Sequence, residues 1–448
     1  MDEATGQPPA VWLVGAGVVG REIARAHLRA GCDLRIADSD PAAIRAAVAE
    51  LTRDGCLGRA VDAGRLGDSL ETAWLLPSAS APLTADAPLA AEAPLAATDS
   101  PGTVDRPPNT AQGQTILIES IAERLEVKQA FFRGAEEWFG EKTAFFTNTS
   151  SLRVGTIATG LRRPQRLAGM HFFMPVSLRP GVELVAAAGT AAETLEFGRR
   201  HIRRLGRQPI IARDEPGFIV NRMLAPYLNQ AMLLFSEGVG GETLEAAAEE
   251  YGMPMSPLEL IDWIGTRTAF DAGRAFWQAF PRRLDPAPLL AALLKRQRLG
   301  RASGGGFYDY ENGARSDSVS PLAAELAGRY RRTGFAPAAR DVPALMAIPM
   351  WIEAMLLLRD GVAEDWETIE QAMAAGLGYT RRGRWGEFVD AIGPRRVLEL
   401  SQTWRGLDRA VDVSAIEGLT ETLRRGLPTG VKTTSAASTR SGASTKNG

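Results

Sequence analysis

The GAGVVG stretch at residues 15–20 is the feature that most restricts what this chain can fold into. It has the spacing G-x-G-x-x-G, and it lies between an apolar run typical of a buried strand (11–17) and a helical pattern. Gly15 would permit the tight turn, Gly17 would let a pyrophosphate approach the backbone, and Gly20 would let the helix pack against the strand. Glycines that serve packing alone can match this spacing, but the strand–turn–helix context favours a dinucleotide-binding unit.

The choice of dinucleotide depends on Asp38, which ends the next predicted strand (33–38). A carboxylate at this place accepts hydrogen bonds from the adenosine ribose hydroxyls and repels a 2′-phosphate. No arginine stands beside Asp38. The sequence therefore predicts NAD, rather than NADP, as the cofactor.

The rest of the first half alternates short apolar runs with helical patterns, which is typical of a parallel α/β sheet. From Phe218 onward, long amphipathic helical patterns dominate, so we place a domain boundary near residue 213. The predicted fold class is a Rossmann-type α/β domain followed by all-α domains. Further strands are predicted at 115–120, 143–148, 167–173 and 181–187.

The helical half contains a divergent internal duplication. PYLNQAMLLFSEGV (226–239) aligns with PMWIEAMLLLRDGV (349–362). TLEAA or TIEQA follows each copy, then Gly252 or Gly376, then LIDWIG or FVDAIG. Two unrelated amphipathic helices would not share these residues in the same order, so we predict a duplicated helical unit.

Two segments have the composition of disordered chain. Residues 77–113 contain the hexads APLTAD, APLAAE and APLAAT, whose regular prolines exclude a helix, and the tail from residue 428 is polar. The predicted organisation is an NAD-binding domain at 1–212 with a disordered insertion at 77–113, a helical domain for substrate and dimerisation at 213–312, a linker at 313–335, a second helical domain at 336–427 and a disordered tail at 428–448.

Composition limits the partners and the compartment. The chain has 448 residues and a net charge of −2, which gives no field to attract nucleic acid or an anionic membrane. Its two cysteines, Cys32 and Cys56, form neither a disulfide framework nor a metal motif. No signal-peptide pattern opens the sequence, and the apolar run at 345–358 is too short for a bilayer and contains Glu353. We expect a cytoplasmic protein without metal, nucleic-acid or membrane partners.

The chain has three histidines, and only one is a good candidate for proton chemistry. His27 lies in a helical pattern, and His201 lies in GRRHIRRLG, which we interpret as a solvated basic face. His171 lies in the apolar run GMHFFMPV, where a lone imidazole is usually a hydrogen-bonded core residue. Polar residues at the ends of neighbouring predicted elements give it possible partners: Ser150, Glu183 and Asn221.

These residues lie in long motifs that resemble those of the L-3-hydroxyacyl-CoA dehydrogenases of fatty-acid β-oxidation. The matching motifs are ESIAERLEVKQAFF, NTSSL, AGMHFFMPV, DEPGFIVNR, PMSPLELIDWIG and GGGFYDY. The resemblance covers roughly residues 10–58 and 115–312. The duplicated segment at 336–420 resembles the second helical domain of the multifunctional fatty-oxidation enzymes, without their hydratase portion.

The resemblance implies NAD-dependent, reversible oxidation of (3S)-3-hydroxyacyl-CoA to 3-oxoacyl-CoA. His171 would be the general base, Glu183 would orient and charge its imidazole, and Ser150 and Asn221 would bond the oxygens of the substrate. Three further residues match cofactor-side positions: Glu123, Lys128 and Asn148. An acyl-CoA substrate is implied, and the resemblance also admits a homodimer and hydratase or thiolase partner subunits.

Two departures from the family pattern keep other functions open. Met174 stands where the family strand has an asparagine, and a methionine cannot donate the same hydrogen bond. After Asp38 the family has a helical hairpin whose basic residues hold CoA, whereas this chain continues differently from Arg53 to residue 113. A dehydrogenase of a free hydroxy acid, like the gulonate dehydrogenases, is one alternative. A weakly catalytic scaffold of a β-oxidation complex is the other.

Overall fold

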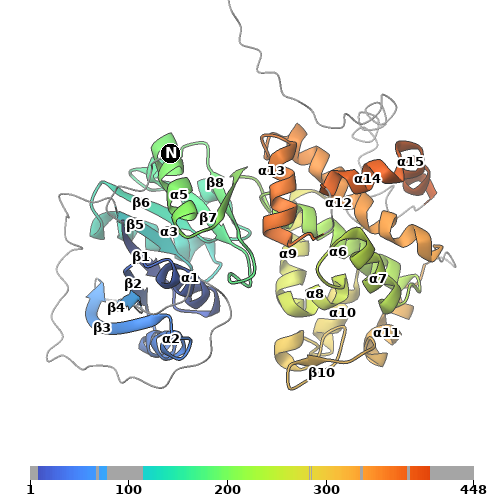
Figure 1. Ribbon diagram of the computed structural model, residues 1–448, viewed down its shortest axis with the longest axis horizontal. Helices are drawn as coiled ribbons and strands as arrows, with labels where there is room; N and C mark the ends of the chain where they lie inside the picture. Colours follow the sequence, from blue (N-terminus) through green and yellow to red (C-terminus); the bar gives the residue numbers. More distant parts are fainter. Residues whose placement is uncertain are drawn as a thin grey trace, which may run out of the picture.

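A computed structural model of the chain describes residues 9–66, 70–77, 115–281, 283, 285–332, 337–380 and 384–403. The described chain forms an α/β lobe from the first half and a helical lobe from the second (Figure 1). The predicted tail and nearly all of the predicted insertion lie outside the described residues.

The first half forms a nine-stranded mixed sheet with the order β3-β4-β2-β1-β5-β6-β7-β8-β9. Strands β2 and β5 flank β1 and run parallel to it, as do β6 and β7. Strand β4 runs antiparallel to β2 and β3, and β8 runs antiparallel to β7. The strands are β1 (Ala10–Val14), β2 (Leu34–Asp38), β3 (Leu57–Leu66), β4 (Leu70–Pro77), β5 (Thr115–Glu119), β6 (Thr143–Thr147), β7 (Leu167–Phe172), β8 (Gly181–Ala186) and β9 (Gln208–Arg213).

Both faces of the sheet are buried, because the side chains of β1 alternate between two apolar cores. Val11 and Leu13 pack in the core that includes Ile23 of α1, while Trp12 pairs with Phe139 on the other face. The helices of this half are α1 (Val18–Arg29), α2 (Pro41–Arg53), α3 (Leu125–Trp138), α4 (Val154–Ile157) and α5 (Ala192–Arg204), with a short 3-10 turn, η1 (Pro164–Arg166).

The sheet departs from the predicted all-parallel pattern in two places. The connection from β7 to β8 is too short for the crossover that a parallel pair needs, so β8 turns back beside β7. The segment after α2 forms the antiparallel pair β3–β4 at the sheet edge, in place of the helical hairpin that the family resemblance implied. Pro77, the first residue of the predicted insertion, belongs to β4.

The second half is helical, as predicted. Its helices are α6 (Val220–Ser236), α7 (Gly241–Tyr251), α8 (Pro257–Ile264), α9 (Thr266–Ala279), α10 (Leu289–Lys295), α11 (Pro321–Gly328), α12 (Val342–Arg359), α13 (Trp366–Gln371), α14 (Trp385–Ile392) and α15 (Pro394–Thr403). Short elements complete it: η2 (Arg301–Ser303), β10 (Tyr310–Glu311), β11 (Ala314–Arg315), η3 (Ala339–Asp341) and the π-helical η4 (Ala372–Leu377). The predicted linker at 313–335 contains β11 and α11. Leu326 and Ala327 of α11 are buried, so this helix packs against the rest of the helical half.

The duplication is visible as two long helices, α6 and α12, that pack along each other. Each contains an internal proline, Pro226 or Pro349, at the matching place. In the first copy the next helix, α7, ends at Gly252. In the second copy α13 continues into η4, which ends at Gly378. Both glycines have the left-handed conformation. Gly376, which the sequence alignment paired with Gly252, instead lies inside η4.

Helix α12 together with η3 spans Ala339–Arg359 and is long and apolar enough to cross a membrane by length and composition. The sequence prediction considered only the apolar run at 345–358, which is too short for a bilayer. In the structure the helical segment begins earlier, at Ala339. Within the structure, 83% of its most apolar window is buried. The apolar surface of α12 is therefore covered by protein, chiefly by α6 and α7.

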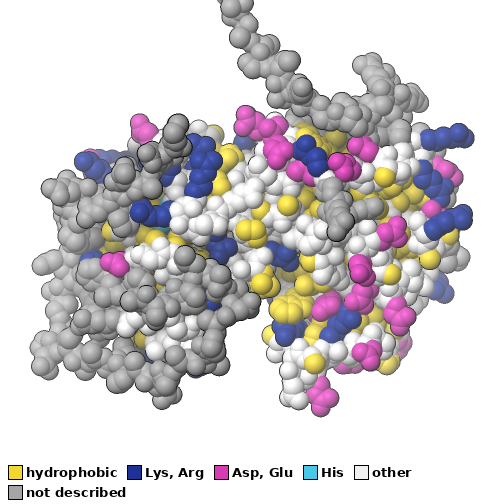
Figure 2. Space-filling model, viewed as in Figure 1, with side chains coloured by type: hydrophobic (Ala, Val, Ile, Leu, Met, Phe, Trp, Pro, Cys, Tyr) yellow, Lys and Arg dark blue, Asp and Glu magenta, His cyan; other side chains and the backbone are white. Residues whose placement is uncertain are grey.

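A buried charge cluster fixes α6 against α12. Arg222 of α6 is 1% exposed and pairs with Glu353 and with Asp360, the latter at 2.6 Å. Arg283 bonds the same two carboxylates at 2.7 and 3.3 Å. Arg359 also pairs with Asp360 at 2.9 Å, so three arginines surround the two carboxylates. These bonds join α6 to the second repeat. On the face that Figure 2 shows, charges of both signs are interspersed over the helical lobe.

His201 does not lie on a solvated face, contrary to the sequence interpretation. It is 2% exposed, and its Nε2 lies 2.9 Å from Nε2 of His27 on the neighbouring α1. The Ile23 carbonyl can only accept, so His27 carries its proton on Nδ1 and its bare Nε2 accepts from His201. His201 Nδ1 is buried without a hydrogen-bond partner among the described residues, so the bond to His27 is the one that this ring keeps.

We predict that this histidine pair makes the fold sensitive to acid. Burial lowers the pKa of His27 to about 4 and that of His201 well below its usual value. The unfolded chain therefore binds more protons below pH 6.5, and stability is lost as pH falls from there toward 4. His27→Gln should reduce this loss by up to about 1.4 kcal/mol per pH unit. Thermal unfolding of both proteins between pH 7 and 4.5 measures it, and parallel curves would contradict it.

Candidate active site

The three glycines of the β1–α1 turn have three different surroundings. Gly15 has φ +108°, and a Cβ there would lie 2.3 Å from the Ser120 carbonyl oxygen. A Cβ on Gly20 would lie 1.9 Å from the Gly15 oxygen, so α1 packs too closely for any side chain. Gly17, at the start of α1, has no atom within 4 Å of such a Cβ. This open backbone at a helix N-terminus fits a phosphate group.

Asp38 lies next to this turn at the end of β2. Its Oδ2 accepts a hydrogen bond of 2.7 Å from the Ala16 amide, and its Oδ1 accepts one of 2.9 Å from the Asp40 amide. The carboxylate is thus held beside the glycine turn, where it can accept further bonds from a ribose. Together with the open space at Gly17, this arrangement fits a bound dinucleotide.

His171 and Glu183 face each other across β7 and β8, as directly opposed residues of the antiparallel pair. The His171 Nδ1–H donates to Glu183 Oε2 over 2.8 Å, which leaves Nε2 as the proton acceptor. Among the described residues, no group bonds to this Nε2. The His171 side chain is 8% exposed and that of Glu183 is fully buried. We call these two residues the His171–Glu183 pair.

A strained turn completes the bonding of Glu183. Glu183 Oε1 accepts from the amides of Ile219 and Val220 at 2.9 and 2.8 Å. The preceding Gly217 and Phe218 both have positive φ, +78° and +48°, and for phenylalanine this conformation costs of order 1–3 kcal/mol. The turn aims two N–H groups at one carboxylate oxygen. Sequence reasoning missed Phe218, because no pattern marks a positive φ at a bulky residue.

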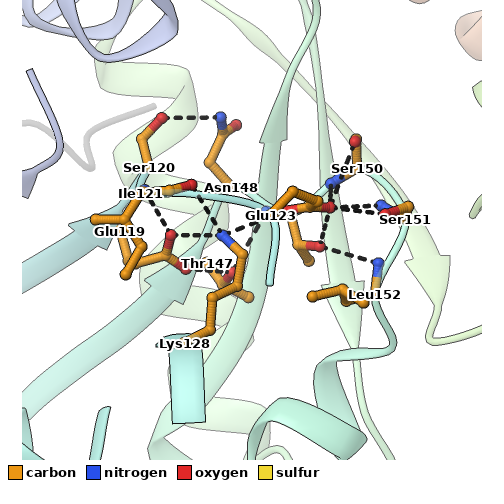
Figure 3. A network of polar contacts seen from close by, with 11 residues as sticks. Glu119, Ser120, Ile121, Glu123, Lys128, Thr147, Asn148, Ser150, Ser151 and Leu152 are labelled. Atoms are coloured by element: carbon orange, nitrogen blue, oxygen red, sulfur yellow. Dashed lines mark hydrogen bonds and ion pairs between the residues drawn. The ribbon is translucent and has the colours of Figure 1, made fainter. Parts of the chain in front are cut away.

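Ser150 and Asn221 are brought to the same place. The Asn221 side-chain amide donates to the Ser150 carbonyl over 3.1 Å, and Asn221 follows directly on Val220. Residues 149–151 form the serine loop, which Glu123 holds from the other side (Figure 3). Its Oε1 accepts from the amides of Ser150 and Ser151, both at 3.0 Å, and from the Thr149 hydroxyl at 2.7 Å. All four residues assigned to the substrate side therefore lie in one connected network.

Lys128 contacts carboxylates rather than open space. Its side chain is fully buried and pairs with Glu119 at 2.6 Å and with Glu123 at 3.3 Å. Burial opposes the ionisation of Glu123, but the Lys128 charge and the hydroxyl and amide donors outweigh it and hold the pKa of Glu123 below its usual value. Of the two carboxylates that pair with Lys128, Glu123 is the accessible one, with 36% of its side chain exposed.

Asn148 joins the sheet edge to the serine loop. Its side-chain oxygen accepts from the Phe172 amide over 2.8 Å, next to His171, and its amide donates to Ser120 over 3.3 Å. Sequence reasoning missed Glu119 and Asp214. The first bonds Thr147 at 2.7 Å beneath the loop, and the second accepts from the Val154 and Gly155 amides, both at 2.7 Å. A carboxylate that ends the apolar run TILIE was the available signal for Glu119.

The sheet, the glycine turn and an imidazole paired with a carboxylate define the class of two-domain nicotinamide-dependent dehydrogenases. Residues 10–215 match the family model described as the 3-hydroxyacyl-CoA dehydrogenase NAD-binding domain, and residues 217–310 match that of the C-terminal domain. The chain belongs to the 3-hydroxyacyl-CoA dehydrogenase family. It is therefore an oxidoreductase with an NAD-binding domain.

Individual relatives agree with the family match. The fatty acid oxidation complex subunit alpha of Pseudomonas savastanoi is 30% identical over 298 residues, which are 65% of this chain and 41% of that protein. The (S)-3-hydroxybutyryl-CoA dehydrogenase structure from Ralstonia eutropha is 26% identical, with a TM-score of 0.53, and covers 68% of this chain and all of its own. The 3-hydroxybutyryl-CoA dehydrogenase structure from Escherichia coli K12 shares the fold over 94% of this chain and 99% of its own, with a TM-score of 0.68 and 22% identity.

Across the ranges that the structure describes, no cluster of three or more His, Cys, Asp or Glu residues is arranged to hold a metal ion. The one buried imidazole–imidazole contact, between His27 and His201, has no carboxylate partner.

We expect Asp38→Ala to relax the choice of nucleotide. Without the Asp38 carboxylate, the repulsion of a 2′-phosphate at the end of β2 is weaker, so use of NADPH should rise relative to NADH. The ratio of kcat/KM for the two cofactors measures this. The native protein should prefer NADH, and equal or better use of NADPH by the native protein would show that Asp38 does not select the cofactor.

We expect His171→Gln to lower turnover by about 10²–10⁴-fold, the usual contribution of a positioned general base, with NADH affinity nearly unchanged. Glu183→Gln should also impair turnover, because a neutral amide no longer stabilises an imidazolium. Steady-state kcat and fluorescence titration with NADH separate the two effects. Wild-type rates in both variants would contradict the assignment of this site.

Proposed function

We propose that the protein interconverts (3S)-3-hydroxyacyl-CoA and 3-oxoacyl-CoA with NAD. The observation that carries this proposal is the His171 imidazole, whose Nδ1–H is bonded to a buried carboxylate while Nε2 stays available. Such a ring can take a proton from a hydroxyl and return it in the reverse direction. The family match and the names of the relatives support the acyl-CoA substrate.

Each residue has a defined part in the proposed reaction. A bound nicotinamide would accept the hydride from C3 of the substrate. His171 Nε2 takes the proton of the 3-hydroxyl, and the Glu183 carboxylate stabilises the resulting imidazolium over the 2.8 Å bond to Nδ1. Ser150 and Asn221 orient the substrate oxygens, and Glu123 holds the serine loop that carries Ser150.

The setting proposed for this reaction is fatty-acid β-oxidation in the cytoplasm. The relative from Pseudomonas savastanoi is named as a subunit of a fatty acid oxidation complex, and this chain spans 41% of its length. We propose that hydratase and thiolase activities reside on partner subunits, and that the helical domain is the surface for a homodimer.

One observation favours a second substrate class, a free hydroxy acid. The antiparallel pair β3–β4 occupies the place where the family resemblance implied a helical hairpin that holds CoA. The described residues of this segment therefore do not form the hairpin that was expected to contact the nucleotide end of CoA. Met174, in place of the family asparagine, is 43% exposed and adds no hydrogen bond to the site.

Purified protein with NADH should reduce acetoacetyl-CoA, which is followed as a loss of NADH absorbance. We expect kcat/KM for acetoacetyl-CoA to exceed that for free acetoacetate by at least about 10²-fold, because binding energy from the CoA moiety supports the transition state. The His171→Gln variant is the control for background oxidation. Equal use of both compounds would favour the free hydroxy acid, and turnover of neither would contradict the proposed function.

A further inference from the structure

The π-helical segment η4 of the second helical repeat packs directly against the residues that bond the His171–Glu183 pair. Gly376 of η4 is the point of closest approach. A Cβ on Gly376 would lie 2.8 Å from Val220 Cγ2 and 3.2 Å from Phe173 Cε2. Both neighbours are buried, with exposed fractions of 2% and 7%. There is no room for even a methyl group at this contact.

Val220 and Phe173 each touch one member of the pair. The Val220 amide donates to Glu183 Oε1 over 2.8 Å. The Phe173 ring packs edge-on against the His171 imidazole, with ring centroids 5.0 Å apart. A displacement of Val220 or Phe173 is therefore transmitted to the carboxylate or to the imidazole without any other residue in between.

The segment η4 cannot retreat from this contact. On its other side, the Ala375 backbone lies against Gly181, where a Cβ would come within 2.9 Å of the Ala375 carbonyl. Gly181 begins β8, the strand that carries Glu183. At the same end of α6, the pairing of Arg222 with Glu353 fixes the helix to the second repeat. Strand β8, η4 and α6 thus form a closed packing unit around the pair.

The backbone of η4 points to the same conclusion. π-helical turns are rare and are frequently found at functional sites. Gly376 lies inside this turn and does not have the positive φ that would require glycine, unlike Gly378, which follows the turn with φ +76°. Glycine at position 376 is explained by space rather than by backbone conformation.

We propose that Gly376 is a positioning residue, through which the second helical repeat sets the geometry of the His171–Glu183 pair. The close packing of Gly376 on Val220 and Phe173 keeps the Val220 amide on Glu183 and the Phe173 ring on His171. The repeat therefore acts on proton transfer although it contributes no group to the substrate. The proposal rests on the proposed function of His171.

The test is Gly376→Ala, assayed with NADH and acetoacetyl-CoA. The new methyl group has to displace Val220, so kcat should fall by about 10–100-fold, as expected for a misplaced catalytic group. The Kd for NADH, measured by fluorescence, should stay within about twofold, because the glycine turn and Asp38 are remote from η4. Gly328→Ala is the matched control, since Gly328 ends α11 and has no atom within 4 Å of its Cβ position; its kcat should equal that of the native protein.

Removing the opposing methyl groups should rescue the variant. In the double variant Gly376→Ala with Val220→Ala, kcat should return to within about threefold of the Val220→Ala single variant, because the space taken by Val220 Cγ2 is freed. A wild-type kcat in Gly376→Ala, or a loss that persists in the double variant, would overturn the proposal. So would loss of NADH binding together with kcat, which indicates general unfolding. If the native protein itself fails to reduce acetoacetyl-CoA, the proposed function fails instead, and the same comparison is decided with the free hydroxy acid that it does turn over.

Discussion

The rest of the structure depends on the hydrogen bonds that the carboxylate of Glu183 accepts. It is fully buried, and a buried charge is tolerated only where donors replace the water it has lost. The imidazole of His171 supplies one donor, and the amides of Ile219 and Val220 supply two. The same carboxylate thus bonds the His171 imidazole and joins the sheet to the first turn of α6. The orientation of the imidazole and the docking of the helical half cannot vary independently.

Features with a local cause could be predicted from the sequence. The glycine turn and Asp38 could be recognised because their spacing within one strand–helix–strand segment is itself the signal. The sequence repeat also predicted two matching helical segments, and they lie on α6 and α12. The roles assigned to His171 and Glu183 came from the family motifs. Their opposition across β7 and β8 then gives that assignment a geometry.

Features that depend on contacts between distant segments could not be predicted. The charge pattern around His201 suggested solvent, and only the neighbouring α1 shows that the ring is buried against His27. The ion pair of the buried Lys128 with Glu119 on the preceding strand likewise leaves no local pattern, and the assignment of Lys128 to the cofactor side stays a prediction. The β3–β4 pair depends on the free edge of β2, which no local pattern reveals. The packing of Gly376 on Val220 joins positions from opposite ends of the helical half.

The pairing of α6 with α12 within one polypeptide has a consequence for how this interface responds to concentration. Two separate subunits that met through such helices would come apart on dilution, with a midpoint set by their dissociation constant. Here the chain itself holds the two surfaces together, so their encounter is intramolecular and its effective concentration does not change with the amount of protein. The buried charges of Arg222 and Glu353 therefore stay paired at any dilution. The packing of α6 on α12 is therefore a property of the fold that does not depend on protein concentration.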